Sequence, residues 1–422
     1  MKFKVTIMRN SSPSYALQKA LAVTRTPALL ESVVEINIGK NTNFYRDART
    51  IRKTPYLLYP AIITLVMAIP AMQQLHTVHL THMDLSRMEL YSILSSPYLI
   101  YLILEAVQIP KLNKFPPPKL RKLTLIAMSS WEGVEPLISQ LADSLEYLEL
   151  QWCSFQALHP LLYPPFPRLR ELRHHQSYVH NTFSDRSRLS ELFHLGSRIT
   201  HLHLSGSFRD TRVAAFPMSL RHLSIEERVL ARRDFWTGSF PRLLSLSVGR
   251  RDGWWRMEDR LRELPSLIRE YFPGITSLQL DVQWSFRNGA LVIARFQRNV
   301  QVLKLVIETT CGLDHEGREW TRLGHQEDIA TPHFHESTLP APLQSLRLDV
   351  IQSCDELERS VAPCTRWVDN DTLSSVTGLG GPDLKSVDVS FIQPERKFIP
   401  GRVLQRQWVK SIKGDWEIDK YL

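Results

Sequence analysis

The sequence Leu145-Glu-Tyr-Leu148-Glu-Leu150 decides the fold, because the same pattern of apolar residues recurs along the chain. Further copies read Leu220-Arg-His-Leu223-Ser-Ile225 and Leu343-Gln-Ser-Leu346-Arg-Leu348. Alternate side chains of a strand face opposite sides, so each copy predicts a short strand with one apolar face. A single strand of this kind cannot bury that face alone, and the pattern therefore predicts a stack of neighbouring strands.

The copies are regularly spaced through the middle of the chain. Their first apolar residues are Val33, Leu75, Leu99, Leu120, Leu145, Leu169, Ile199, Leu220, Leu243, Ile275, Val300, Leu343 and Leu384. Between Leu75 and Val300 the intervals run from 21 to 32 residues, and leucine-rich repeats have periods of about 20–29 residues. The longer intervals that start at Val33, Val300 and Leu343 each contain either a degenerate copy or an inserted loop. For 309–342 we expect an inserted surface loop, because the segment has many charges and no apolar period.

Helical spacing separates several of the strands. Segments 131–141, 188–195 and 260–271 place their apolar residues on one face, and prolines precede strands in Phe166-Pro-Arg-Leu169 and Phe240-Pro-Arg-Leu243. We therefore predict an α/β leucine-rich repeat solenoid, with a parallel inner sheet and helices on the convex side. The position that usually holds Asn after each strand varies between copies, so we expect an irregular horseshoe.

The predicted organisation is one elongated repeat domain with caps. Residues 1–32 are expected to form a helical N-terminal cap, 33–392 the repeats, and 393–422 a C-terminal cap carrying Trp408 and Trp416. Capping protects the open edges of a solenoid.

Composition narrows the class of protein. The net charge of +9 comes from 52 basic and 43 acidic residues, without a run of five like charges. None of the four cysteines forms a C-x-x-C pair, which favours a reducing compartment and a cytoplasmic or nuclear location. No signal peptide is evident at the N-terminus. Tyr56 to Met72 is uncharged; it is either a buried helix behind the first repeats, which we favour, or a membrane span.

The runs Phe166-Pro-Arg-Leu-Arg-Glu-Leu172, Phe240-Pro-Arg-Leu-Leu-Ser-Leu246 and Asp143-Ser-Leu-Glu-Tyr-Leu-Glu-Leu150 resemble the leucine-rich repeats of eukaryotic F-box proteins, especially the fungal group. The resemblance covers roughly residues 30 to 390. It implies a module that selects substrates for a cullin ubiquitin ligase. In that family an F-box docks on a Skp-type adaptor, but no F-box opening is evident in this chain, so the adaptor is expected only if an F-box is encoded upstream.

The residues between the repeat leucines are predicted to face the concave surface and to bind a partner. These candidates are Tyr147, Glu149, Gln151, Glu171, Arg173, His175, His201, His203, His222, Glu226, Asp281, Arg347 and Asp349. The central part of this set is aromatic, basic and imidazole-bearing, and the C-terminal part is acidic. Tyr and Arg are the residue types that most often carry binding energy at interfaces.

Metal binding is a weaker hypothesis for two groups of histidines. Glu171, His201 and His222 with His203 would lie on successive strands, and His333, His335 and Glu336 with His315 cluster in sequence. Solvated histidines are the alternative that we favour for both.

Enzyme signatures are missing from the sequence, which contains no G-x-S-x-G, no phosphate-binding loop and no H-E-x-x-H. We therefore expect a monomeric, non-enzymatic protein-binding module without a cofactor. Its expected function is substrate recognition, as in the F-box/leucine-rich repeat subunits of cullin ubiquitin ligases. The alternatives are a stand-alone scaffold or inhibitor-like repeat protein with no ubiquitin link, and a nucleic-acid-associated protein that uses the basic surplus.

Overall fold

The structure of the protein is a computed structural model. It describes residues 2–8, 11–39, 55–111, 119–128, 133–151, 153, 166–175, 198–205, 217–226, 239–249, 266–283, 299–313, 319–321, 343–354, 383–393, 402–411 and 416–421. The chain divides into two compact units, unit 1 (Met1–Leu220) and unit 2 (Arg221–Leu422).

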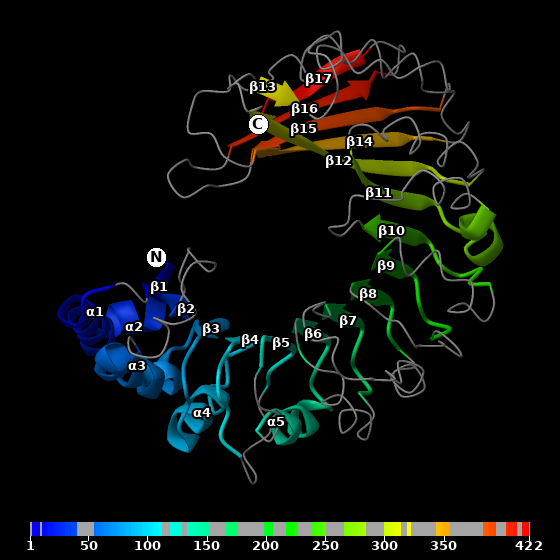
Figure 1. The fold of residues 1–422 in the computed structure, drawn as a ribbon. Helices are drawn as coiled ribbons and strands as arrows, with labels where there is room; N and C mark the ends of the chain where they lie inside the picture. The colour runs from blue at the N-terminus through cyan, green and yellow to red at the C-terminus, as the bar shows by residue number, and fades with distance from the viewer. Residues whose placement is uncertain are drawn as a thin grey trace. The chain divides into compact units, whose positions relative to one another are not determined.

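Unit 1 is a ladder of parallel strands in chain order (Figure 1). The strands are β1 (Phe3–Ile7), β2 (Val33–Ile38), β3 (Thr77–Thr81), β4 (Tyr101–Glu105), β5 (Lys122–Ile126), β6 (Tyr147–Gln151), β7 (Glu171–His175) and β8 (His201–Ser205). The repeat leucines align across the ladder, as Leu123, Leu148 and Leu172 do on consecutive strands. The predicted solenoid-like stacking of short parallel strands is therefore present.

Helices cover one face of the unit 1 sheet (Figure 1). They are α1 (Pro13–Arg25), α2 (Pro27–Ser32), α3 (Pro55–Ala68), α4 (Arg87–Leu94) and α5 (Val134–Leu141), with a short 3₁₀ turn, η2 (Ile69–Ala71). Ser86 caps the N-terminus of α4 with a capping box. Its hydroxyl accepts a hydrogen bond from the backbone amide of Glu89, and the Glu89 carboxylate accepts one from the backbone amide of Ser86. The helix expected within 131–141 is confirmed as α5. The one expected at 188–195 lies outside the described residues.

The predicted boundary at residue 33 is wrong. Residues Phe3–Ile7 form β1, which pairs in parallel with β2, so the sheet begins before the helices that were assigned to the cap. The alternating sequence Phe3-Lys-Val-Thr-Ile7 carries this strand signal, with Val5 and Ile7 each 1% exposed. The long interval after Val33 contains no additional strand in the ladder, because β2 pairs directly with β3.

The apolar segment from Tyr56 to Met72 forms α3 and η2 behind the first strands. Leu65, Ile69 and Met72 are fully buried, whereas Leu57 and Met67 are 63% and 45% exposed. Within the described parts of the chain, no helix has the length and apolar character needed to cross a membrane.

Consecutive strands of unit 1 end in the same left-handed turn. Gly39, His82, Ala106 and Ala127 follow β2, β3, β4 and β5 with positive φ. The amides of His82, Ala106 and Ala127 donate to a carbonyl on the next strand, at 2.8 Å in each case. The same backbone turn therefore follows these strands and satisfies backbone hydrogen-bonding groups, although the side chains at the turn differ between copies.

Unit 2 continues the repeat pattern, and its parallel strands are longer from β11 onward. β9 (His222–Glu226), β10 (Ser245–Gly249), β11 (Ser277–Gln283), β12 (Val302–Leu313), β14 (Ser345–Cys354) and β15 (Ser386–Gln393) are parallel. A short helix at residues 266–271 precedes β11, within the segment predicted to be helical.

Two predicted segments of unit 2 contain strands. The expected loop at 309–342 is wrong at its start, because β12 runs to Leu313 and β13 (Glu319–Thr321) folds back on it antiparallel. β12 nevertheless pairs directly with β14, which fits an insertion and leaves no place for a repeat strand between them. The C-terminal segment forms β16 (Arg402–Lys410) and β17 (Trp416–Tyr421), both antiparallel. Trp408 is fully buried and anchors it.

Candidate functional site

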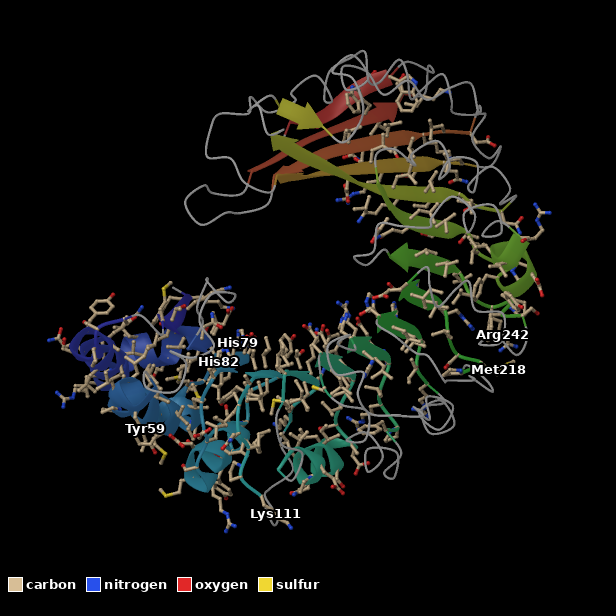
Figure 2. The ribbon with its side chains drawn as sticks, in the orientation of Figure 1. Tyr59, His79, His82, Lys111, Met218 and Arg242 are labelled. Atoms are coloured by element: carbon tan, nitrogen blue, oxygen red, sulfur yellow. The ribbon has the colours of Figure 1, made fainter. Side chains whose placement is uncertain are left out.

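The candidate site lies on the face of β4–β8 that is opposite the helices. Figure 2 shows this division for unit 1, with His79 on the uncovered face and Tyr59 on the helical side. Strand alternation sends the repeat leucines toward the helices and the residues between them to the uncovered face. We call this uncovered surface of β4–β8 the inner face.

Glu149 is the centre of the inner face. Its Oε2 accepts hydrogen bonds from the Tyr147 hydroxyl at 2.6 Å and from the Thr124 hydroxyl at 3.1 Å. Its Oε1 accepts from the Gln151 amide at 2.7 Å, and His175 Nε2 lies 3.4 Å away. Three neighbouring strands, β5, β6 and β7, thus supply partners to one carboxylate.

This arrangement holds Glu149 ionised. Burial opposes ionisation, but the hydrogen bonds from His175, Tyr147, Gln151 and Thr124 outweigh it and lower the pKa of Glu149 to about 2. Burial and the neighbouring Glu149 carboxylate raise the pKa of Tyr147, so its hydroxyl stays protonated as a donor. Glu149 itself is only 8% exposed. The prediction that it is an exposed contact residue is therefore wrong, because it organises the surface from beneath.

Tyr147 is held on several sides. The Arg173 guanidinium lies 5.5 Å and the Lys122 ammonium 5.9 Å from its ring centroid, both within the range of cation–π attraction. Tyr101 meets it edge-on with centroids 6.2 Å apart, and the Tyr101 hydroxyl lies 2.9 Å from that of Thr124. Arg173 is fixed in turn by Glu171 Oε1 at 2.7 Å. Long side chains are therefore pre-positioned on this surface.

Two histidines, His175 on β7 and His203 on β8, lie at the C-terminal end of this cluster of side chains. His175 Nδ1 lies 2.7 Å from the Ser205 hydroxyl, and the rings of His175 and His203 have centroids 4.6 Å apart. Burial, followed by the nearby His175 and Arg173, lowers the pKa of His203 to about 4, so this imidazole is neutral at pH 7.

Glu149, His175 and Ser205 have the order of an acid, a base and a nucleophile. The acid–base contact of 3.4 Å is long for a hydrogen bond, whereas Gln151 donates to the same oxygen at 2.7 Å. Glu149 is thus shared between His175 and three other donors, Gln151, Tyr147 and Thr124. The geometry suits a fixed polar surface better than an activated nucleophile.

Other predicted residues of unit 1 lie where strand alternation places them. Glu171 and His201 are register partners on β7 and β8. His201 and Arg173 are exposed, while Gln151 is half-buried. His222 belongs to unit 2, where it pairs with Ser245.

The candidate metal cluster of Glu171, His201, His203 and His222 is not supported. Among the described residues, no group of three or more His, Cys, Asp or Glu side chains is arranged to hold a metal ion. The segment with His315, His333, His335 and Glu336 lies outside the described residues.

The sequence reasoning missed three members or neighbours of the inner face. Tyr101 and Thr124 belong to copies whose outward residues were not followed, although strand alternation would have found both. His174 takes the place of a core leucine in β7 and is 1% exposed. Burial, with a smaller contribution from His175, lowers its pKa to about 3.

A smaller polar cluster lies on β3 and β4. His79 Nε2 is 3.3 Å from Glu105 Oε2 and 3.2 Å from the Thr81 hydroxyl. The hydrogen bond from His79 outweighs burial and lowers the pKa of Glu105. The polar surface therefore extends from the inner face toward the N-terminal strands.

The acidic group predicted in unit 2 is largely compensated. Asp349 is 4% exposed, with Lys304 Nζ at 3.0 Å and Arg347 Nε at 2.8 Å. Asp281 accepts from Gln279 at 3.0 Å, and burial raises its pKa. The expected open acidic end is thus wrong for Asp349. Glu226, which was predicted to be an outward-facing contact residue of the Leu220 copy, is likewise buried, because only 5% of it is exposed.

Lys304 is the residue that sequence reasoning missed in unit 2. It follows Leu303 on β12, at the alternating position that strand geometry assigns to the polar face, and it aligns with Arg347 of β14. Its ammonium is one of the two cations that neutralise Asp349.

Comparison with known proteins leaves the surface to be interpreted from its own chemistry. No known family model matches the chain, and no curated protein sequence matches it significantly.

Proposed function

We propose that the chain is a leucine-rich repeat protein that binds another protein through the inner face of unit 1. The observation that carries the proposal is the interlocked cluster of Tyr101, Tyr147, Glu149, Arg173 and His175, which the helices do not cover. Its members lie on three strands, β4, β6 and β7, and fix one another by hydrogen bonds and ring contacts.

Such a surface has the properties of a binding epitope. Tyr and Arg are enriched among the residues that dominate binding energy, and side chains fixed in advance lose less conformational entropy when a partner docks. Glu149 contributes by positioning Tyr147 and Gln151, whereas Arg173 and Tyr147 offer contact area. A structural role alone would need fewer long, partly exposed side chains at these positions.

The biological setting that we propose is substrate recognition, as in F-box/leucine-rich repeat subunits of cullin ubiquitin ligases. The support is the sequence resemblance of the repeats together with the parallel solenoid-like ladder. A stand-alone scaffold or inhibitor-like binding protein is the alternative. Binding to a Skp-type adaptor distinguishes substrate recognition from this alternative.

The binding function is tested by affinity capture with quantitative mass spectrometry. The wild-type chain is compared with the double variant Tyr147→Ala and Arg173→Ala, and with a control pair on the helical side, Met88→Ala and Tyr91→Ala, both exposed in the wild type. We expect the double variant to lose a defined set of proteins that the control pair retains. Equal capture by all three proteins would contradict a role for the inner face.

The ubiquitin link has its own test, which is co-purification with a recombinant Skp-type adaptor. Stable binding supports substrate recognition. A folded chain that captures partners but not the adaptor supports the scaffold.

A further inference from the structure

A second surface of unit 1 lies at the edge of the sheet where the strands begin, and it is rich in cations. Six exposed side chains make up this surface. Five of them lie just before β5, β7 or β8, and the sixth is the first residue of β5. We call them the basic edge: Lys119, Arg121, Lys122, Arg168, Arg170 and Arg198.

Backbone hydrogen bonds fix the spacing of these positions. The Arg121 carbonyl accepts from the amides of Glu146 and Tyr147, and the Glu146 carbonyl accepts in the same way from Arg170 and Glu171. Arg121 and Arg170 therefore directly precede strands that are two steps apart in the ladder, or about 10 Å. Arg168 and Arg198 occupy the same place before the adjacent strands β7 and β8, about 5 Å apart.

Little negative charge compensates the basic edge. Of its six side chains, within the described part of the chain, Arg121 alone has a carboxylate within ion-pair distance. That partner is Glu146, 3.8 Å away, in a pair whose side chains are 62% and 39% exposed. Asp143 is also exposed nearby in sequence. An exposed pair of this kind is weak, so the edge retains a positive field.

We propose that the basic edge binds an acidic, extended segment of a partner protein. An extended chain advances about 3.3 Å per residue. Carboxylates three residues apart would therefore match the spacing of about 10 Å between Arg121 and Arg170. This site adjoins the Tyr147 cluster at Lys122, whose ammonium lies 5.9 Å from the Tyr147 ring centroid. Its other five cations lie outside that cluster, and the site stands whether or not the inner face binds a partner.

The neighbouring surface favours a polypeptide over a single-stranded nucleic acid. Nucleic-acid grooves combine cations with open aromatic rings on which bases stack. Here the ring of Tyr147 already has Lys122 and Arg173 beside it, and its hydroxyl is bound by Glu149.

The test is fluorescence anisotropy with the full chain and a labelled Glu-Gly-Gly repeat peptide. A Gln-Gly-Gly peptide and a single-stranded oligothymidylate serve as comparison probes. The edge variant carries Arg168→Glu and Arg198→Glu. The control variant carries Arg87→Glu and Lys111→Glu, which are also exposed and change the net charge by the same amount. Thermal unfolding followed by circular dichroism verifies that both variants fold.

We expect the wild-type chain to prefer the Glu-Gly-Gly peptide to both other probes. The edge variant should bind it about tenfold more weakly, and the control variant within about twofold of wild type. Absence of binding by the wild type, or an equal loss in both variants, would overturn the proposal. Tighter binding of the oligothymidylate would also overturn it and would identify the edge as a nucleic-acid surface.

Discussion

Replacing His174 with leucine tests how the repeat pattern is built into the core. His174 lies on β7 at the position that other copies fill with leucine; its register partners are Leu150 on β6 and Leu204 on β8. Both leucines are fully buried, and His174 is 1% exposed. A leucine of similar size in this environment restores the pattern and removes a titratable group from the core.

The magnitude follows from the pKa of His174, which burial lowers to about 3 from an ordinary value of 6.5. Because the folded-state pKa is the lower one, the unfolded chain takes up the proton first, and stability falls as the pH drops below 6.5. Linkage gives a loss of about 2 kcal/mol between pH 8 and pH 5 from this residue alone. His203, with a pKa of about 4, causes a further loss of stability between the same pH values. That loss remains in His174→Leu, because the variant keeps His203.

The assay is urea unfolding followed by circular dichroism at pH 8 and pH 5. We expect His174→Leu to lose about 2 kcal/mol less than wild type between the two pH values. His201→Gln is the matched control, because it removes an exposed histidine from the next strand and should keep the acid sensitivity of wild type. If His174→Leu loses as much stability as wild type, His174 is not a neutral core residue and the reasoning fails.

Four further predictions concern two backbone positions, the Glu149 hydrogen-bond network and the reactivity of Ser205. Ala106→Gly should raise the free energy of unfolding by up to about 1 kcal/mol, because Ala106 has a φ of 48°; a decrease in thermal stability would contradict this. Gly39→Ala should destabilise, since its Cβ would lie 2.2 Å from the Thr81 carbonyl oxygen. Glu149→Ala should cost about 3 kcal/mol at pH 7, and wild type should lose this advantage as the pH falls from 4.5 toward 2; identical acid unfolding of both proteins would argue against the network. A fluorophosphonate probe should leave Ser205 unlabelled, and labelling detected by mass spectrometry would instead show an activated nucleophile.

The strand ladder was predictable because its signal is local and periodic. The repeat leucines mark β3 to β8 almost to the residue, and alternation alone assigns Arg173 and His175 to the uncovered face. β1 was missed because one short alternating strand stands apart from the repeats. The full length of β12 was missed because its extension beyond Ile307 is paired by β13 and β14, which no local pattern reveals.

The chemistry of the site was less predictable than its location. A polar residue at an outward position was expected to be exposed, yet Glu149 and Asp349 are buried beneath the longer side chains that they bind. Strand periodicity fixes which face a residue is on, whereas its burial depends on partners from neighbouring strands. For Glu149 those partners are Thr124 and His175, which are 25 and 26 residues distant in sequence.

Site-specific photo-crosslinking in cell extract tests the central claim most directly. A photoreactive residue at Lys122, on the inner face, is compared with one at Met88, which is 69% exposed on the helical side. The account predicts a discrete crosslinked protein from position 122 that disappears in the Tyr147→Ala and Arg173→Ala background, and none from position 88. Crosslinking from position 88 alone, or crosslinking from position 122 that is unaffected by the two substitutions, would contradict it.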